Sequence, residues 1–315
     1  MSSGGRLQET PAAFTKKCRE MKRRFSAWKE EFIMEKSIKR YMPIFVLPTF
    51  FAFILGFIVP FIMGIWLSFC KFTTVTDAKF VGFSNYIEAL KDTAFRHSFW
   101  YTVLFAIASL LIINIIAFAL AMALTKEMHG TNVFRTVFFM PNLIGGIVLG
   151  YIWQLIFNGV LSRYGTALAL NEWYGFWGLI ILVSWQQIGY MMIIYIAGLN
   201  NVSPDLVEAA QIDGATNRQI LFKIKIPMIM PSVTICTFLT LTNGFKMFDQ
   251  NLSLTGGNPG KQSQLLALNI YDTFYARSGA QWKGIGQAKA VVFFLLVVAI
   301  ALIQLRATSS KEVQQ

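Results

Sequence analysis

Residues 203–232 read SPDLVEAAQIDGATNRQILFKIKIPMIMPS and separate two long apolar runs of the chain. Ser203 is a preferred residue at a helix N-cap, and Pro204 suits the first helical position. Glu208 then falls near the positive end of the helix dipole, where a negative charge is stabilising. Gly214 predicts the end of this helix, because glycine adopts the left-handed conformation at little cost. The stretch therefore begins with a short polar helix.

A second short helix is predicted after this glycine. Thr216 followed by Gln219 has the spacing of a capping box at a helix N-terminus. Ile220 and Ile224 then fall on one face of the helix, and Pro227 marks the turn into the next apolar run. The two helices together predict a helix–glycine–helix elbow, whose small alanines allow another protein to approach closely.

The composition on either side of the elbow is that of an integral membrane protein. Of the 315 residues, 55% are hydrophobic and only 14% are charged, whereas soluble domains carry about a quarter charged residues. Mean hydropathy is +0.52, and the aromatic share of 15% suits side chains at lipid and at the membrane interface. Three scattered cysteines exclude a disulfide scaffold and lack metal-binding spacing.

Six charge-free runs are long enough, or nearly so, to cross a bilayer, which takes about 20 residues of helix. They are 41–70, 98–125, 136–162, 173–204, 226–245 and 290–305. The last has only 16 residues, and we expect Lys289 and Arg306 to extend their charged groups from its ends toward water. The predicted fold class is all-α, a polytopic membrane protein with six transmembrane helices.

Basic residues set the expected orientation. Residues 1–42 hold 11 Lys and Arg against 5 Glu, and such segments stay on the cytoplasmic side. We expect a cytoplasmic N-terminal segment 1–43, a transmembrane domain 44–306 with the loop 203–227 in the cytoplasm, and a cytoplasmic tail 307–315. A polybasic stretch directly before a span indicates contact with anionic membrane lipid and no nucleic-acid partner.

Groups for catalysis or metal binding are missing from the sequence. No HExxH, GxSxG or paired CxxC motif occurs, and GGNPGKQ at 256–262 lacks the spacing of a phosphate-binding loop. The first four spans contain no acidic or basic residue, whereas a proton-coupled carrier usually needs an ionisable group in the membrane. We expect no catalytic residue, no metal and no enzyme activity. A membrane enzyme and an ATP-independent secondary carrier are the less favoured alternatives.

The elbow resembles the EAA motif in permease subunits of binding-protein-dependent ABC importers, with Ile226 where that family usually has Leu. In the family this loop is a coupling helix that inserts into a cleft of the ATP-hydrolysing subunit. The resemblance implies that ATPase coupling falls to Glu208, Ala209, Ala210, Asp213, Gly214, Ala215, Ile224 and Pro227. This chain would hold no cofactor, because ATP and Mg²⁺ would be bound by the partner subunits.

Other stretches are similar to the carbohydrate branch of these importers, and within it to the first permease subunit of maltose-type and glycerol-phosphate-type systems. They are FVGFSNYIEAL at 80–90, FFMPNLIGGIVLGYIW at 138–153 and FDQNLSLTGGNPG at 248–260. The resemblance implies a type I, maltose-type permease fold in a bacterial plasma membrane and import of a sugar by alternating access. The implied partners are a second permease, two ATPase subunits and an external solute-binding protein. Import of a non-sugar solute is the alternative.

Polar and aromatic residues within the spans are the candidates for a substrate path, because a sugar needs hydrogen-bond partners and aromatic faces. The resemblance favours the helices on either side of the elbow. The predicted path residues are Trp185, Gln186, Gln187, Tyr190, Asn243 and Phe245. The alternative is that such amides hold helices together, each contributing about 1 kcal/mol. Gly146 and Gly150 form a GxxxG pair that predicts close helix packing, with the partner permease as one candidate for the opposing helix.

Overall fold

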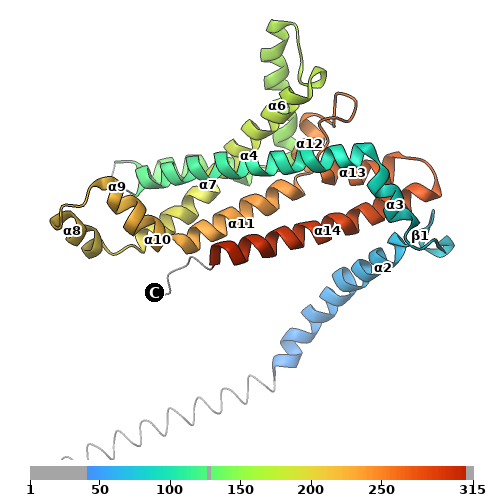
Figure 1. Cartoon of the computed structure of the whole chain (residues 1–315), viewed down its shortest axis with the longest axis horizontal. Helices are drawn as coiled ribbons and strands as arrows, with labels where there is room; N and C mark the ends of the chain where they lie inside the picture. Colours follow the sequence, from blue (N-terminus) through green and yellow to red (C-terminus); the bar gives the residue numbers. More distant parts are fainter. Residues whose placement is uncertain (1–40, 126–128, 310–315) are drawn as a thin grey trace, which may run out of the picture. The chain divides into compact units, whose positions relative to one another are not determined.

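The computed structural model describes residues 41–125 and 129–309, and these are almost entirely helical (Figure 1). The first helix runs from Tyr41 to Ser68 and includes a π-helical turn, Ile54–Ile58, followed by α2, Val59–Ser68. Its part up to Gly64 forms a unit of its own, and the second unit begins at Ile65. The predicted segments 1–43 and 307–315 lie mostly outside the described residues.

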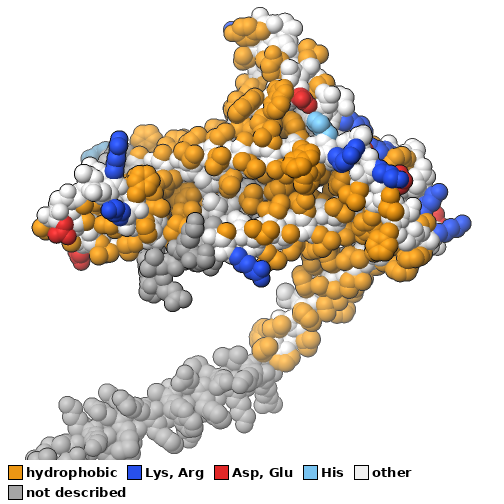
Figure 2. Space-filling view, viewed as in Figure 1, with side chains coloured by type: hydrophobic (Ala, Val, Ile, Leu, Met, Phe, Trp, Pro, Cys, Tyr) orange, Lys and Arg blue, Asp and Glu red, His pale blue; other side chains and the backbone are white. Residues whose placement is uncertain are grey.

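The second unit is built around three long helices. They are α4, Thr93–Leu124, α7, Glu172–Asn200, and α11, Met230–Lys246. Helix α7 is central, since 67% of its most apolar stretch is buried, against 28% for α4 and 11% for the last helix, α14. Phe105, Leu179 and Met191 are fully buried between these helices. Many other apolar side chains are exposed on the outside of the unit, as lipid-contacting surfaces require (Figure 2).

Two of the predicted spans are broken by sharp bends. The third combines α5, Thr131–Phe139, and the 3₁₀ turn Met140–Leu143 with α6, Gly146–Leu161, and bends by 99°. The fifth combines α9, Asn217–Ile220, the π-helical turn Leu221–Lys225 and α10, Ile226–Met228, with α11, and bends by 71°. Four helices are long and apolar enough to cross a membrane, and the described residues give six spans if each bent pair counts as one.

Short elements connect the spans. Strands β1, Cys70–Lys71, and β2, Lys79–Phe80, pair antiparallel before α3, Ser84–Lys91. The elbow contains α8, Pro204–Ile212. Between α11 and α14 lie α12, Asp249–Leu254, α13, Leu266–Tyr271, and a π-helical turn, Asp272–Ala276. The 3₁₀ turns are Val75–Asp77, Ser162–Tyr164 and Leu168–Leu170.

The prediction for the last span needs a correction. Helix α14 runs from Ala280 to Ser309, so it begins ten residues before the predicted start. Lys289 does not extend toward water from a helix end. Its side chain is fully buried within the helix bundle, where polar partners from other segments surround the amine. The sixth span was predicted to start after Lys289 because this residue is charged. In the structure that charge is neutralised inside the protein by Asp92, so the helix continues past it.

The GxxxG pair packs closely against α12 of this chain. A Cβ atom at Gly150 would overlap the Oγ of Ser253, and one at Gly146 would come within 2.8 Å of the Gln250 side chain. The predicted role in close helix packing is therefore confirmed, with α12 as the partner.

Candidate coupling and substrate sites

The elbow has the local structure that its sequence predicts. Helix α8 begins with Pro204 at its first position, although Ser203 makes no side-chain hydrogen bond to the helix. Gly214 ends the turn with a φ of 78°. Thr216 and Gln219 form the predicted capping box, with the Gln219 amide oxygen accepting from the Thr216 backbone N–H at 2.7 Å. These features depend on neighbouring residues only, which is why the sequence was sufficient.

The coupling residues on α8 are presented to the outside of this chain. Helix α8 has no buried residue. Glu208 and Ala209 are exposed, and Ala210 is half-buried. Ile212 is 87% exposed and Leu206 is 47% exposed, an unfavourable arrangement for apolar side chains in water. Such a surface is typical of a site that another protein covers.

The rest of the elbow connects this surface to the bundle. Ile220 is 4% exposed, and Ile224 and Pro227 are half-buried, as the predicted apolar face requires. Asp213 and Gly214 are exposed at the turn, and Ala215 is half-buried beyond it.

A cavity of about 390 Å³ lies beneath α8. Its walls include Met122 from α4, Leu199 from α7, and Glu208 and Gln211 from α8. Helix α8 and the ends of α4 and α7 therefore line one shared cavity.

The predicted path residues lie on α7 and α11, with different surroundings. Gln186 is 7% exposed and its amide nitrogen donates to the Ile144 carbonyl oxygen at 3.1 Å. Its amide oxygen accepts from the Gln250 amide at 2.8 Å. Gln187 is 8% exposed, and its Oε1 is buried without a hydrogen-bond partner among the described residues. Burying an acceptor without a hydrogen-bond partner costs free energy. Gln187 is therefore a better candidate than Gln186 for a hydrogen bond to a passing substrate.

The remaining path candidates are aromatic or exposed. Trp185 packs edge-on against Trp153, with ring centroids 5.6 Å apart. Tyr190 lies near Phe139, with ring centroids 6.4 Å apart. Phe245 is 3% exposed, whereas Asn243 is exposed. That these residues line one water-accessible cavity stays a prediction.

Asn114 shows what an interhelical amide looks like in this bundle. Its nitrogen donates to Thr240 Oγ1 of α11 at 3.2 Å, and its oxygen accepts from the Tyr195 hydroxyl of α7 at 2.8 Å. All its polar atoms are therefore occupied by the chain itself. Among the described residues the Gln187 Oε1 has no such partner, and Asn243 is exposed.

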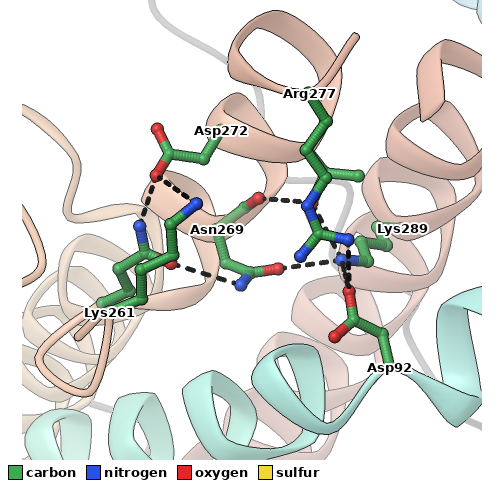
Figure 3. A network of polar contacts seen from close by, with 8 residues as sticks. Asp92, Lys261, Asn269, Asp272, Arg277 and Lys289 are labelled. Carbon is green, nitrogen blue, oxygen red and sulfur yellow. Dashed lines mark hydrogen bonds and ion pairs between the residues drawn. The ribbon is translucent and has the colours of Figure 1, made fainter. Parts of the chain in front are cut away.

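A polar network that we did not predict from the sequence lies at the end of the bundle opposite the elbow (Figure 3). The buried amine of Lys289 donates to Asp92 at 2.7 Å, to Thr273 Oγ1 at 2.8 Å and to Asn269 Oδ1 at 3.1 Å. Arg277 reaches the same Asp92 carboxylate at 3.2 Å. We call these five residues the clasp, because they join the start of α4, the α13 segment and α14.

Asp92 has two tasks in the clasp. Its carboxylate also accepts from the Ala94 backbone N–H at 3.0 Å and so caps α4. Burial alone would raise the pKa of Asp92, but the hydrogen bond and charge of Lys289, together with Arg277, hold this pKa below its usual value. The carboxylate is therefore ionised at neutral pH.

The described residues contain no group of three or more His, Cys, Asp or Glu side chains arranged to hold a metal. Helices that can cross a membrane, with an exposed elbow at one end, define a polytopic membrane subunit built to contact a second protein. The chain belongs to the family of binding-protein-dependent transport system inner membrane components, which it matches over residues 116–308. It is accordingly a multi-pass membrane permease subunit, and ATP hydrolysis resides in separate subunits.

Sequence relatives of this chain include several sugar permeases. It is 42% identical over 279 residues to the probable starch degradation products transport system permease protein AmyD of Thermoanaerobacterium thermosulfurigenes, covering 86% of this chain and 94% of the relative. It is 28% identical over 282 residues to the multiple sugar-binding transport system permease protein MsmF of Streptococcus mutans, with the same coverage of 86% and 94%.

The solved structures that it resembles share the fold. A bacterial ABC transporter involved in import of the acidic polysaccharide alginate matches with a TM-score of 0.73 and 20% identity, over 88% of this chain and 98% of that chain. The fold class predicted from the sequence is confirmed.

Proposed function

We propose that this chain is one of the permease subunits of an ATP-driven carbohydrate importer, and that oligosaccharides from starch are the first substrates to test. The observation that carries the proposal is the 42% identity to the AmyD permease, which extends over 86% of this chain. Relatives named for multiple sugars, arabinooligosaccharides and α-glucosides support the carbohydrate class. The other components would be a second permease, two ATPase subunits that bind ATP and Mg²⁺, and a solute-binding protein.

Helix α8 would couple ATP hydrolysis to transport. Its exposed Glu208, Ala209 and apolar Ile212 suit insertion into a cleft of the ATPase subunit. Closure of the ATPase dimer would then displace α8 and, through the contacts around its cavity, the ends of α4 and α7. Such rigid-body movement of helices is a common form of alternating access.

The orientation of the chain in the membrane follows from the assignment of α8 as the coupling helix. The elbow and both termini would be cytoplasmic, and the loop that contains Gly257 would be external. Residues 22 and 311, the positions best suited to labelling near the termini, lie outside the described residues. A cysteine introduced at Gly257 should react with an impermeant reagent in whole cells, whereas cysteines at 22 and 311 should react only after lysis. Labelling of position 22 in intact cells would contradict this topology.

The substrate assignment is tested by transport. The complete complex, reconstituted with its solute-binding protein in proteoliposomes that contain ATP, should accumulate labelled maltotriose. Labelled methionine and histidine are the matched non-sugar controls and should not accumulate. Accumulation of an amino acid in place of the sugar would assign the chain to a different importer class.

A further inference from the structure

A pocket with aromatic walls lies beside α13 and the start of α14. Helix α13 is at the end of the second unit opposite α8 (Figure 1). Its volume is about 380 Å³, within the range of small-molecule sites. Its walls include Phe248, Tyr271, Phe274, Tyr275, Gly286 and Gln287. In the proposed orientation this is the external end, where a substrate arrives.

The rings of this pocket form a continuous series. Phe248 and Tyr271 have centroids 5.1 Å apart, and Tyr271 and Tyr275 have centroids 4.9 Å apart. Tyr271 is 42% exposed and Tyr275 is 69% exposed, so their faces are available to a ligand. In the part of the chain that the structure describes, no hydrogen bond occupies the two tyrosine hydroxyls or the Gln287 amide. The pocket thus combines aromatic faces with free polar groups.

The clasp holds this aromatic series in place. Asn269 and Thr273, which bind the Lys289 amine at 3.1 and 2.8 Å, alternate along the chain with Tyr271 and Tyr275. A Cβ atom at Gly286 would come within 3.0 Å of Phe274, so the π-helical turn rests directly on α14 at a glycine. A buried ionic network and a close backbone approach are stronger supports than an isolated loop provides.

We infer that this pocket is an external carbohydrate subsite that receives the sugar before it enters the path between α7 and α11. The inference rests on the proposed function. A pyranose ring has apolar C–H faces that fit against aromatic rings and a rim of hydroxyls that need hydrogen-bond partners. Phe248 follows the path candidate Asn243 by five residues and lies just before α12, after the end of α11. The subsite and the predicted path are therefore consecutive along the chain.

Tyrosines at this level could instead anchor the protein at the membrane interface, where such side chains are enriched. The two roles differ in one measurable respect. An anchor contacts lipid and leaves the sugar untouched, whereas a subsite touches the sugar itself. The test therefore combines transport with direct labelling of the pocket.

The experiment uses the complete complex in proteoliposomes with saturating maltotriose-loaded binding protein. The double variant Tyr271→Leu/Tyr275→Leu should lower maltotriose uptake per assembled complex by about five- to tenfold, since about 1.4 kcal/mol of lost interaction corresponds to tenfold. The double variant to Trp, which keeps the aromatic faces, should retain most of the uptake. Tyr164→Leu removes a tyrosine that is 80% exposed in another external loop and is the matched control.

A diazirine derivative of maltotriose supplies the direct readout. In the wild-type complex it should label residues 271–275, and unlabelled maltotriose should suppress the labelling. If the wild-type complex takes up maltotriose and the Leu variant takes it up equally well, the pocket is not a subsite. Labelling of the wild-type complex that unlabelled maltotriose does not suppress would also overturn the subsite. A wild-type complex that takes up no carbohydrate would overturn the proposed function itself.

Discussion

The two ends of the second unit differ in how far their functional side chains are buried. At one end, α8 buries none of its residues and leaves Ile212 87% exposed. At the other end, the clasp surrounds the amine of Lys289, which is fully buried and has three oxygen partners. The apolar side chains of α8 are covered only if another protein binds there. The polar groups of the clasp find their partners within this chain. Substitutions at the clasp should therefore damage stability, whereas substitutions at α8 should damage coupling.

The largest effect is expected at the clasp. Asp92→Asn keeps an oxygen to cap α4 but removes the charge that neutralises Lys289, and breaking one partner of a buried ion pair costs about 3–5 kcal/mol. Thermal unfolding of the purified complex should show a large decrease in Tm.

Lys289→Met in the Asp92→Asn background should restore part of that loss, because no unpaired buried charge then remains. Strict additivity of the two losses would show that the two residues do not act as a pair.

The next effect is expected at α8. Gly214→Asp imposes about 1 kcal/mol of strain on a left-handed turn, and no atom lies within 4 Å of a Cβ there to cause a clash. Glu208→Lys reverses the charge of an exposed side chain in the middle of α8. Both variants should assemble but lose most of the ATPase stimulation by loaded binding protein.

Gly165→Asp is the matched control for Gly214. Gly165 has a φ of 68° and equally open surroundings, and it lies in the loop before α7, far along the chain from α8. It should keep normal stimulation. Equal losses at Gly165 and Gly214 would mean that backbone strain alone, and not the coupling contact, lowers the activity.

A smaller effect is expected in the substrate path. The double variant Gln187→Leu/Asn243→Leu places a good helix former at both positions while removing their hydrogen-bonding groups. Complex yield should stay at the wild-type level, because the Gln187 oxygen has no partner among the described residues. Sugar uptake should fall several-fold. Unchanged uptake per assembled complex would assign these amides to helix packing.

The smallest effect concerns pH. The pKa of Asp92 is held below its ordinary value of 3.8, so its contribution to stability is complete above that value and is lost as the pH falls through the lowered pKa. The difference in Tm between wild type and Asp92→Asn should therefore be constant from pH 5 to 8 and should shrink below about pH 4. A difference that grows on acidification would contradict the assignment of the carboxylate as ionised.

The same contrast explains what could be predicted from the sequence. The elbow followed from Pro204 at a helix start, Gly214 at a turn and the capping box of Thr216 and Gln219, since such features are local. The Lys289–Asp92 contact joins residues 197 positions apart, and nothing in the sequence near Lys289 indicates its partner. Pro141 and Pro227 lie in the short turns of the two bent spans, but whether a proline bends a span depends on the packing around it. Long-range pairs and bend angles therefore had to come from the structure.

We propose that ATP hydrolysis elsewhere in the complex drives a sugar through this chain by way of α8. The decisive experiment is uptake of labelled maltotriose by proteoliposomes with and without the two ATPase subunits. We expect accumulation that requires internal ATP, the binding protein and both ATPase subunits, and that is abolished by Glu208→Lys. Accumulation that continues without the ATPase subunits would show that the protein is a secondary carrier and that α8 does not couple ATP hydrolysis to transport.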